Sequence, residues 1–143
     1  MNTNFDDVQD MYYHFGLVEN EFSEDRPPHL LSNDMMVQRM KHLREEILEL
    51  STAYDEGNLV EAADGLVDLV VIAMGTAALM NLPWEELWRE VHRSNMSKRR
   101  GTAQESKRDY ATDLIKGLNY KPPEIAQVLY KAGWKQDNFP EES

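Results

Sequence analysis

Residues 66–80, LVDLVVIAMGTAALM, form the stretch that decides the fold of this chain. The run is almost unbroken in its apolar character, and its single charge is Asp68. A helix that spans a membrane needs about 20 apolar residues, so the run predicts a buried helix of a soluble domain. Because an unpaired buried carboxylate costs several kcal/mol, we expect Asp68 to be neutral, paired or bound to a metal.

Acidic residues also interrupt the apolar pattern in the segment that precedes this run. Residues 43–50 read LREEILEL, so three glutamates stand among core-type side chains. Two acid-bearing amphipathic helices without an equal number of basic partners favour a shared cation. For Asp68 the alternative is a buried salt bridge to an arginine or a lysine.

The length and composition of the chain limit the classes of protein to which it can belong. A chain of 143 residues and 16.6 kDa is long enough for one core, so we expect a single domain over residues 1–143. The net charge of −11 argues against a nucleic-acid polymer as partner, but a divalent cation can still bridge acidic side chains to a small phosphorylated substrate. The absence of cysteine and of a signal-peptide pattern is typical of a cytoplasmic protein, and we expect no membrane partner.

The periodicity is helical nearly throughout. It predicts helices over residues 5–15, from about 33 to 56, from a cap at Asn58 to about 80, over 84–96, and over about 123–131. Short connections between the second, third and fourth helices predict antiparallel neighbours. We therefore expect an all-α fold with a four-helix-bundle core over about residues 33–100. Residues 101–143 are expected to form a basic, irregular extension with one short helix.

Helical spacing gathers the acidic side chains into two stripes. Glu46 and Glu49 share one face of the first acidic helix, and Glu61, Asp64 and Asp68 follow one another down the next. If the two helices are antiparallel, Glu49 and Asp64 fall at a similar depth, and Glu46 faces Asp68 about one turn deeper. All-oxygen sites of this kind suit Mg²⁺ or Mn²⁺.

The acids have two other interpretations. Glu45 and Glu61 can equally belong to ordinary solvated helix faces. A di-iron carboxylate bundle needs Glu-x-x-His on two helices, and this pattern does not occur in the chain.

Three segments together resemble a known family. They are EEILE at residues 45–49, the stretch from Asp68 through Gly75, and EVHRSNMSK at residues 90–98. The chain resembles the MazG-like all-α nucleoside triphosphate pyrophosphohydrolases, including their phosphoribosyl-ATP pyrophosphohydrolase-type branch. The resemblance covers about residues 33–100.

The second acidic motif of that family, E-x-x-D, fits this sequence in two registers. Glu61-Ala62-Ala63-Asp64 matches it literally, whereas the flanking apolar pattern aligns better with Asp68 as the family aspartate. In the second register, which we favour, the family glutamate falls on Gly65 and Asp64 stands in for it. Whether Glu61 or Asp64 completes the motif stays open.

The resemblance and the chemistry of such a site imply a role for each candidate residue. Mg²⁺, with Mn²⁺ as a substitute, would be held by Glu46, Glu49, Asp64 and Asp68. Glu45 and Glu46 are the candidate catalytic residues, with Glu45 as a base or an additional ligand. The candidates that hold the substrate phosphates are Arg93, Asn95 and Lys98.

The implied activity is cleavage of a (deoxy)nucleoside triphosphate between its α- and β-phosphates. The products are a nucleoside monophosphate and pyrophosphate, and the reaction shapes or sanitises the nucleotide pool. A homodimer or homotetramer is expected, both from the family and because the helices are apolar on more than one face. The alternative is a catalytically inactive helical bundle that binds nucleotides or other proteins, which Gly65 in place of the family glutamate favours.

Overall fold

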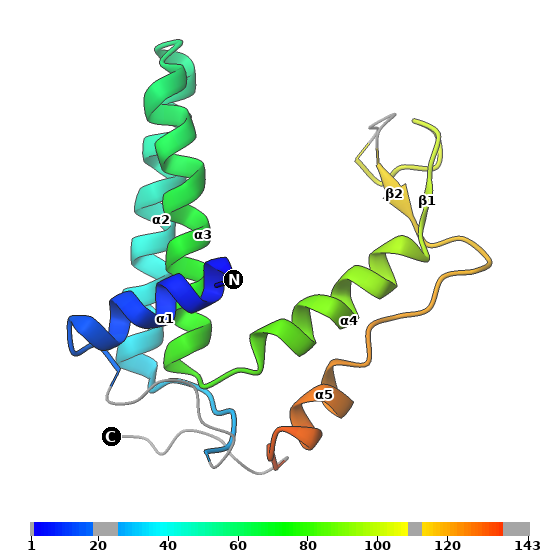
Figure 1. The fold of residues 1–143 in the computed structure, drawn as a ribbon. Helices are drawn as coiled ribbons and strands as arrows, with labels where there is room; N and C mark the ends of the chain where they lie inside the picture. Colours follow the sequence, from blue (N-terminus) through cyan, green and yellow to red (C-terminus); the bar gives the residue numbers. More distant parts are fainter. Residues whose placement is uncertain (1, 19–25, 109–112, 136–143) are drawn as a thin grey trace. The chain divides into compact units, whose positions relative to one another are not determined.

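The computed structural model describes residues 2–18, 26–108 and 113–135, and these residues are predominantly helical (Figure 1). The chain divides into two compact units. The first comprises Met1–Leu82 together with Ala132–Ser143, and the second comprises Pro83–Lys131. The all-α prediction is confirmed, whereas the single domain over residues 1–143 stays a prediction beside this division.

An antiparallel pair of long helices dominates the first unit. Helix α2 (Asn33–Asp55) begins after Ser32, whose side chain accepts an N–H of the first turn. Helix α3 (Leu59–Leu79) begins in the same way after Asn58. Between them Gly57 adopts φ 66°, a left-handed conformation that glycine reaches without strain. The cap at Asn58 and the short connection predicted from the sequence are confirmed.

Two contacts define how α2 and α3 lie against each other. Gly65 on α3 faces Leu50 on α2, and a Cβ added to this glycine would lie 3.5 Å from the Leu50 Cβ. Further along, the Arg39 Nε donates a hydrogen bond of 2.9 Å to the Thr76 Oγ1. Both pairs belong to one register, because Arg39 precedes Leu50 by as many residues as Gly65 precedes Thr76. The interval is about three helical turns, so each helix uses one face for both contacts.

Helix α1 (Asn4–His14) crosses this pair (Figure 1). It starts with a capping box, in which Thr3 and Asp6 exchange hydrogen bonds of 2.9 and 3.1 Å between side chain and backbone N–H. Its buried face packs against α3 and consists of Phe5, Val8 and Tyr12. The N-terminal helix therefore supplies part of the buried core of the first unit, before the residue 33 at which the bundle core was expected to begin.

Helix α1 lies very close to α3 at a glycine. A Cβ built on Gly75 would lie 1.9 Å from the Tyr12 Oη and 2.1 Å from its Cζ. Tyr12 is only 4% exposed, so its ring fills the space that a side chain at position 75 would need. The absence of a side chain at Gly75 thus allows α1 to pack closely against α3.

The second unit contains α4 (Trp84–Met96), β1 (Arg99–Arg100), β2 (Leu114–Ile115) and α5 (Ile125–Lys131). Helix α4 begins where predicted, after Pro83. The strands form an antiparallel ladder that the sequence did not predict. Strands of two residues are too short to show the alternation by which strands are recognised.

Polar contacts tie the C-terminal end of α4 to the segment before α5. The Ser97 Oγ accepts the Lys121 backbone N–H at 2.9 Å, and Arg93 donates to the Pro122 carbonyl at 3.1 Å. In the loop after β1, Glu105 accepts hydrogen bonds from Arg99 and Thr102, and these contacts lower the pKa of Glu105 to about 2. The expected irregular extension therefore has ordered contacts of its own. The place of α4 in a four-helix bundle stays a prediction, since α4 belongs to the second unit.

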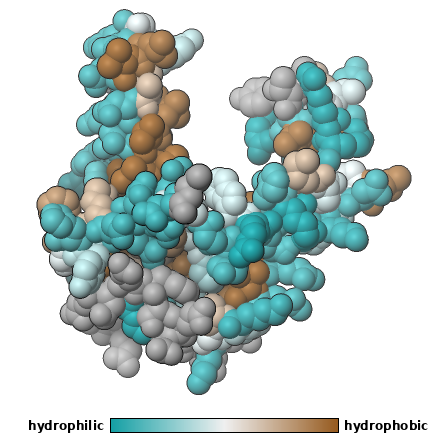
Figure 2. Space-filling view, viewed as in Figure 1, coloured by the Kyte–Doolittle hydropathy of each residue, from teal (hydrophilic) through white to brown (hydrophobic). Residues whose placement is uncertain are grey.

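Apolar side chains cover much of the exposed surface of the α2–α3 pair. Figure 2 shows brown, hydrophobic atoms along this pair of helices. Between residues 47 and 70, the large apolar side chains that are 50 to 80% exposed are Ile47, Leu48, Tyr54, Leu59, Val60, Leu66, Val67 and Val70. We call these eight residues the hairpin apolar surface.

By length and composition alone, α3 is apolar enough to cross a membrane, a property that core helices of soluble proteins share. Its acidic stripe of Glu61, Asp64 and Asp68 would be costly inside a bilayer. Part of the helix, including Ile72 and Ala77, is buried by the rest of the chain. The absence of a membrane partner stays a prediction that these features support.

The close contact between Tyr12 and Gly75 leads to a prediction about the stability of the protein. Gly75→Ala should destabilise the protein by about 1–3 kcal/mol, because the new methyl group forces Tyr12 out of its buried position. Urea unfolding followed by circular dichroism measures this change. Gly65→Ala is the matched control, since its methyl group meets Leu50 at ordinary contact distance and removes a helical glycine. Equal stability changes in the two variants would contradict the close packing of Tyr12 on Gly75.

Candidate active site

Glu46 is the centre of the candidate site. It lies on α2 with its side chain only 13% exposed, and its Oε1 lies 3.7 Å from the His42 Nε2. Its other carboxylate oxygen, Oε2, is buried and has no hydrogen-bond partner in the described residues. A buried carboxylate oxygen without a partner is costly, so this position favours a proton or a cation.

The environment of Glu46 favours its protonated form. Burial raises the pKa of Glu46 above its ordinary value, and the carboxylates of Glu49 and Asp68 raise it further. His42 opposes this shift, but its effect is smaller. Glu46, Glu49 and Asp68 are therefore electrostatic neighbours, as the helical spacing predicted for Glu46 with each of the other two.

Asp68 differs from its expected environment. We expected apolar neighbours to bury it on all sides, but it is half-buried, and Leu66, Val67 and Val70 around it are exposed. The reason is that, among the described residues of the first unit, no helix covers this side of α3. None of the ion pairs in the described residues involves Asp68, so the alternative of a salt bridge to arginine or lysine finds no support there.

The remaining acids of the two stripes are exposed. Glu49 and Glu61 line one shallow depression near the hairpin turn, together with Leu48, Thr52, Ala53 and Glu56. Asp64 is exposed on α3, and Glu45 is exposed on α2 beside Glu46. Glu49 thus borders both this depression and the Glu46–Asp68 pair.

The chemistry of these side chains fits Mg²⁺ or Mn²⁺, because the donors are all carboxylate oxygens. The orphaned Glu46 Oε2 is the structural observation that supports the fit. In the described ranges, no three His, Asp or Glu side chains lie close enough to form a complete ion-binding group. An ion bound to Glu46 would therefore need side-chain movement or further oxygens from substrate, water or a second chain.

The three candidate phosphate-binding residues lie at the C-terminal end of α4, in the second unit. Arg93 pairs with Glu90 and holds the Pro122 carbonyl, and the Glu90 contact raises the pKa of its guanidinium. Asn95 is exposed, and Lys98 is half-buried one residue before β1. Since these residues and the acids belong to different units, their meeting around one substrate stays a prediction.

The charge distribution along the sequence separates the same two groups. Residues 45–88 contain no lysine or arginine, although they include every acid of the two stripes. Residues 93–121 contain eight of the 15 basic residues of the chain. The α2–α3 turn region thus offers carboxylates only, and positive side chains that could hold a phosphate are concentrated in the second unit.

Arg39 and His42 are the residues near the acids that sequence reasoning missed. His42 contacts Glu46 one turn away on α2. Arg39 lies seven residues before Glu46, so both belong to one helix face. The available signal was a single arginine between Met36, Met40 and Leu43, in a stripe that otherwise predicts core.

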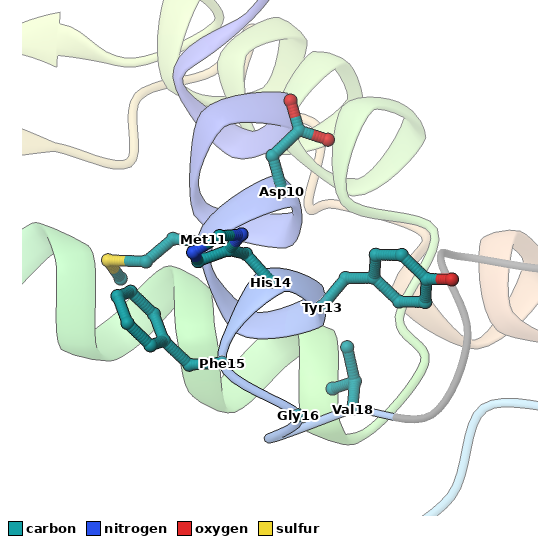
Figure 3. Close-up of a pocket in the computed structure, with 7 residues that line it drawn as sticks. All are labelled: Asp10, Met11, Tyr13, His14, Phe15, Gly16 and Val18. Carbon is teal, nitrogen blue, oxygen red and sulfur yellow. The ribbon is translucent and has the colours of Figure 1, made fainter.

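A second depression lies at the C-terminal end of α1 (Figure 3). The rings of His14 and Phe15 meet edge to face at 4.8 Å. Figure 3 shows that Tyr13 extends to the opposite side of the helix from Phe15, and that Asp10 points away from both. The side chains do not converge on one centre, so the depression lacks the geometry of a ligand pocket.

Comparison with known proteins places the chain in a family. No curated protein matches it. The family model described as phosphoribosyl-ATP pyrophosphohydrolase matches residues 6–95. The match begins in α1, well before the expected start at residue 33, and it spans both acidic helices. It ends at Asn95, so Lys98 lies outside it. The chain therefore belongs to the phosphoribosyl-ATP pyrophosphohydrolase family, which indicates a hydrolase that acts as a pyrophosphohydrolase on a nucleotide.

Proposed function

We propose that this protein hydrolyses a (deoxy)nucleoside triphosphate between its α- and β-phosphates in the presence of Mg²⁺, with Mn²⁺ as a substitute. The observation that carries the proposal is the buried, unpartnered Glu46 Oε2 beside Glu49 and Asp68. A buried carboxyl group whose pKa is raised by burial and by two neighbouring carboxylates forms an environment that a divalent cation would stabilise. Such a reaction controls or cleans a nucleotide pool.

Each candidate acidic residue has a role in the proposed reaction. Glu46, Glu49, Asp64 and Asp68 would hold the metal. When bound, Mg²⁺ neutralises charge on the phosphate oxygens and lowers the pKa of a coordinated water. Glu45, exposed beside Glu46, would accept the proton of the attacking water.

Hydrolysis adds one water across the phosphoanhydride. The water oxygen bonds to phosphorus, the bridging oxygen leaves with the other product, and the proton passes to the base. Lys98, Asn95 and Arg93 would bind the phosphate oxygens as their charge changes. The choice of the α–β bond follows from the pyrophosphohydrolase family and not from the geometry of the acids.

The hairpin apolar surface supports a further part of the proposal, a homodimer or homotetramer. A monomer rarely exposes so many neighbouring large apolar side chains. The surface belongs to the two helices that carry the acids, so a second copy that covers it would also bring more side chains close to the site. A partner hairpin of the same shape would complete a four-helix bundle.

The product assay tests the reaction. Incubation with Mg²⁺ and a panel of NTPs and dNTPs should yield a monophosphate and pyrophosphate from one or two of them, as separated by chromatography. Diphosphate with inorganic phosphate would overturn the bond assignment. A lack of turnover with both Mg²⁺ and Mn²⁺ would favour the alternative of a binding module.

The raised pKa of Glu46 predicts a pH-dependent stability. The folded protein holds this proton more tightly than the unfolded chain, so the contribution of Glu46 is most favourable below its ordinary pKa of 4.5 and is lost as pH rises through the raised value. Glu46→Gln should therefore melt at a higher temperature than the wild type near neutral pH without metal. The difference should vanish in acid.

Thermal unfolding between pH 4 and 8 in the presence of a chelator measures this effect. Added Mg²⁺ should stabilise the wild type and leave Glu46→Gln unchanged. Glu45→Gln, at the exposed neighbouring position, is the control for a lost charge on α2. A wild type more stable than Glu46→Gln at neutral pH without metal would contradict the assignment.

Oligomerisation is tested by solution mass. Light scattering should give a multiple of the 16.6 kDa chain, and Val67→Asp should shift the protein toward the monomer, because it buries a charge in the proposed contact. Gln127→Asp, at an exposed polar position on α5, should leave the mass unchanged. A wild-type mass of one chain would refute this part of the proposal.

A further inference from the structure

Arg39 joins the three helices of the first unit at a single guanidinium. Its Nη2 donates to the Tyr12 Oη on α1 at 2.5 Å and to the Ile72 carbonyl on α3 at 2.9 Å. Its Nε donates to the Thr76 Oγ1 at 2.9 Å, and Thr76 in turn donates to the Ile72 carbonyl at 2.8 Å. The Arg39 Cζ lies 5.4 Å from the centre of the Tyr12 ring.

The partners of Arg39 are neutral, which is unusual for a cation on a strongly acidic protein. None of the ion pairs within the described residues involves Arg39. A guanidinium presents a planar fork of donors that can bond several acceptors at once, and a lysine ammonium cannot reproduce that fork. The arrangement is therefore one that connects helices.

Glu46, Glu49 and Asp68 lie between the two contacts that set the α2–α3 register. Arg39 with Thr76 forms the contact on one side, and Leu50 with Gly65 forms the contact on the other. Glu46 and Asp68 face each other in the interval, and their charges repel. Helices that carry facing carboxylates would separate or slide unless contacts on both sides resist the repulsion.

We propose that Arg39 is a positioning residue, which holds α2 and α3 in the register that keeps Glu46 beside Asp68. The inference rests on the proposed function, since it assigns to Arg39 the geometry of the proposed metal ligands. The inference also assigns a role to Tyr12 and Gly75. The Tyr12 ring occupies the space beside Gly75, and its hydroxyl accepts a hydrogen bond from the Arg39 guanidinium.

The test measures Mg²⁺ affinity by titration calorimetry in the whole 143-residue chain, with circular dichroism to establish that each variant is folded. Arg39→Gln should weaken Mg²⁺ binding by about 10- to 100-fold, the usual effect of losing a residue that orients metal ligands. In turnover assays the Mg²⁺ concentration for half-maximal rate should rise by a similar factor. A purely structural role would lower the amount of folded protein and leave that concentration unchanged.

Two matched variants distinguish the hydrogen-bonding role of Arg39 from a general effect of its positive charge. Arg44→Gln removes an exposed cation that is closer to Glu46 in sequence, and it should leave Mg²⁺ affinity close to the wild-type value. Arg39→Lys keeps the positive charge but loses the planar set of guanidinium donors, so its Mg²⁺ binding should stay weaker than that of the wild type. Full recovery in Arg39→Lys, or an equal loss in Arg44→Gln, would overturn the proposal in favour of a simple charge effect.

Milder variants keep the test decisive if Arg39→Gln does not fold. Tyr12→Phe and Thr76→Val each remove one hydrogen bond of the junction, and each should weaken Mg²⁺ binding in the same direction by a smaller factor. Unchanged affinity in both would overturn the role of Arg39. A wild-type protein that binds no Mg²⁺ would instead refute the proposed function, so the two failures are distinguishable.

Discussion

The repulsion between Glu46, Glu49 and Asp68 is the constraint around which the first unit is organised. Helices α2 and α3 bring these like charges together, although no lysine or arginine occurs between residues 45 and 88 to offset them. Their approach is supported by apolar contact at Gly65 and by the hydrogen bonds of Arg39. A carboxylate cluster that weakens the free protein is typical of sites that are stabilised by a bound cation.

Local signals account for what the sequence predicted correctly. Ser32 determines where α2 begins, and Gly57 and Asn58 determine where α2 ends and α3 begins, because capping and left-handed turns depend on residues a few positions apart. The short turn then sets the antiparallel register, and the register places Glu46 near Asp68. This part of the candidate site was predictable because each step follows from spacing along the chain.

Tertiary packing accounts for what the sequence did not predict. Helical periodicity shows which residues share a face, but it does not show whether another helix covers that face. Ile47 and Tyr54 are seven residues apart and share one face of α2, yet both are largely exposed, whereas Tyr12 on α1 is buried against Gly75. The role of Arg39 was hidden for the same reason, since its partners come from α1 and α3. The strand pair was missed because its two-residue strands carry no periodicity at all.

The separation of charges bears directly on the proposed reaction. A nucleoside triphosphate is a polyanion, and the carboxylates of α2 and α3 would repel it without a cation between them. Mg²⁺ accounts for only part of this compensation, because a phosphate chain presents several charged oxygens to the protein. Eight of the 15 basic residues fall in 93–121, whereas residues 45–88 contain none. On the proposed assignment, carboxylates of α2 and α3 would hold the ion, and basic residues of 93–121 would supply the further positive charge that a triphosphate needs.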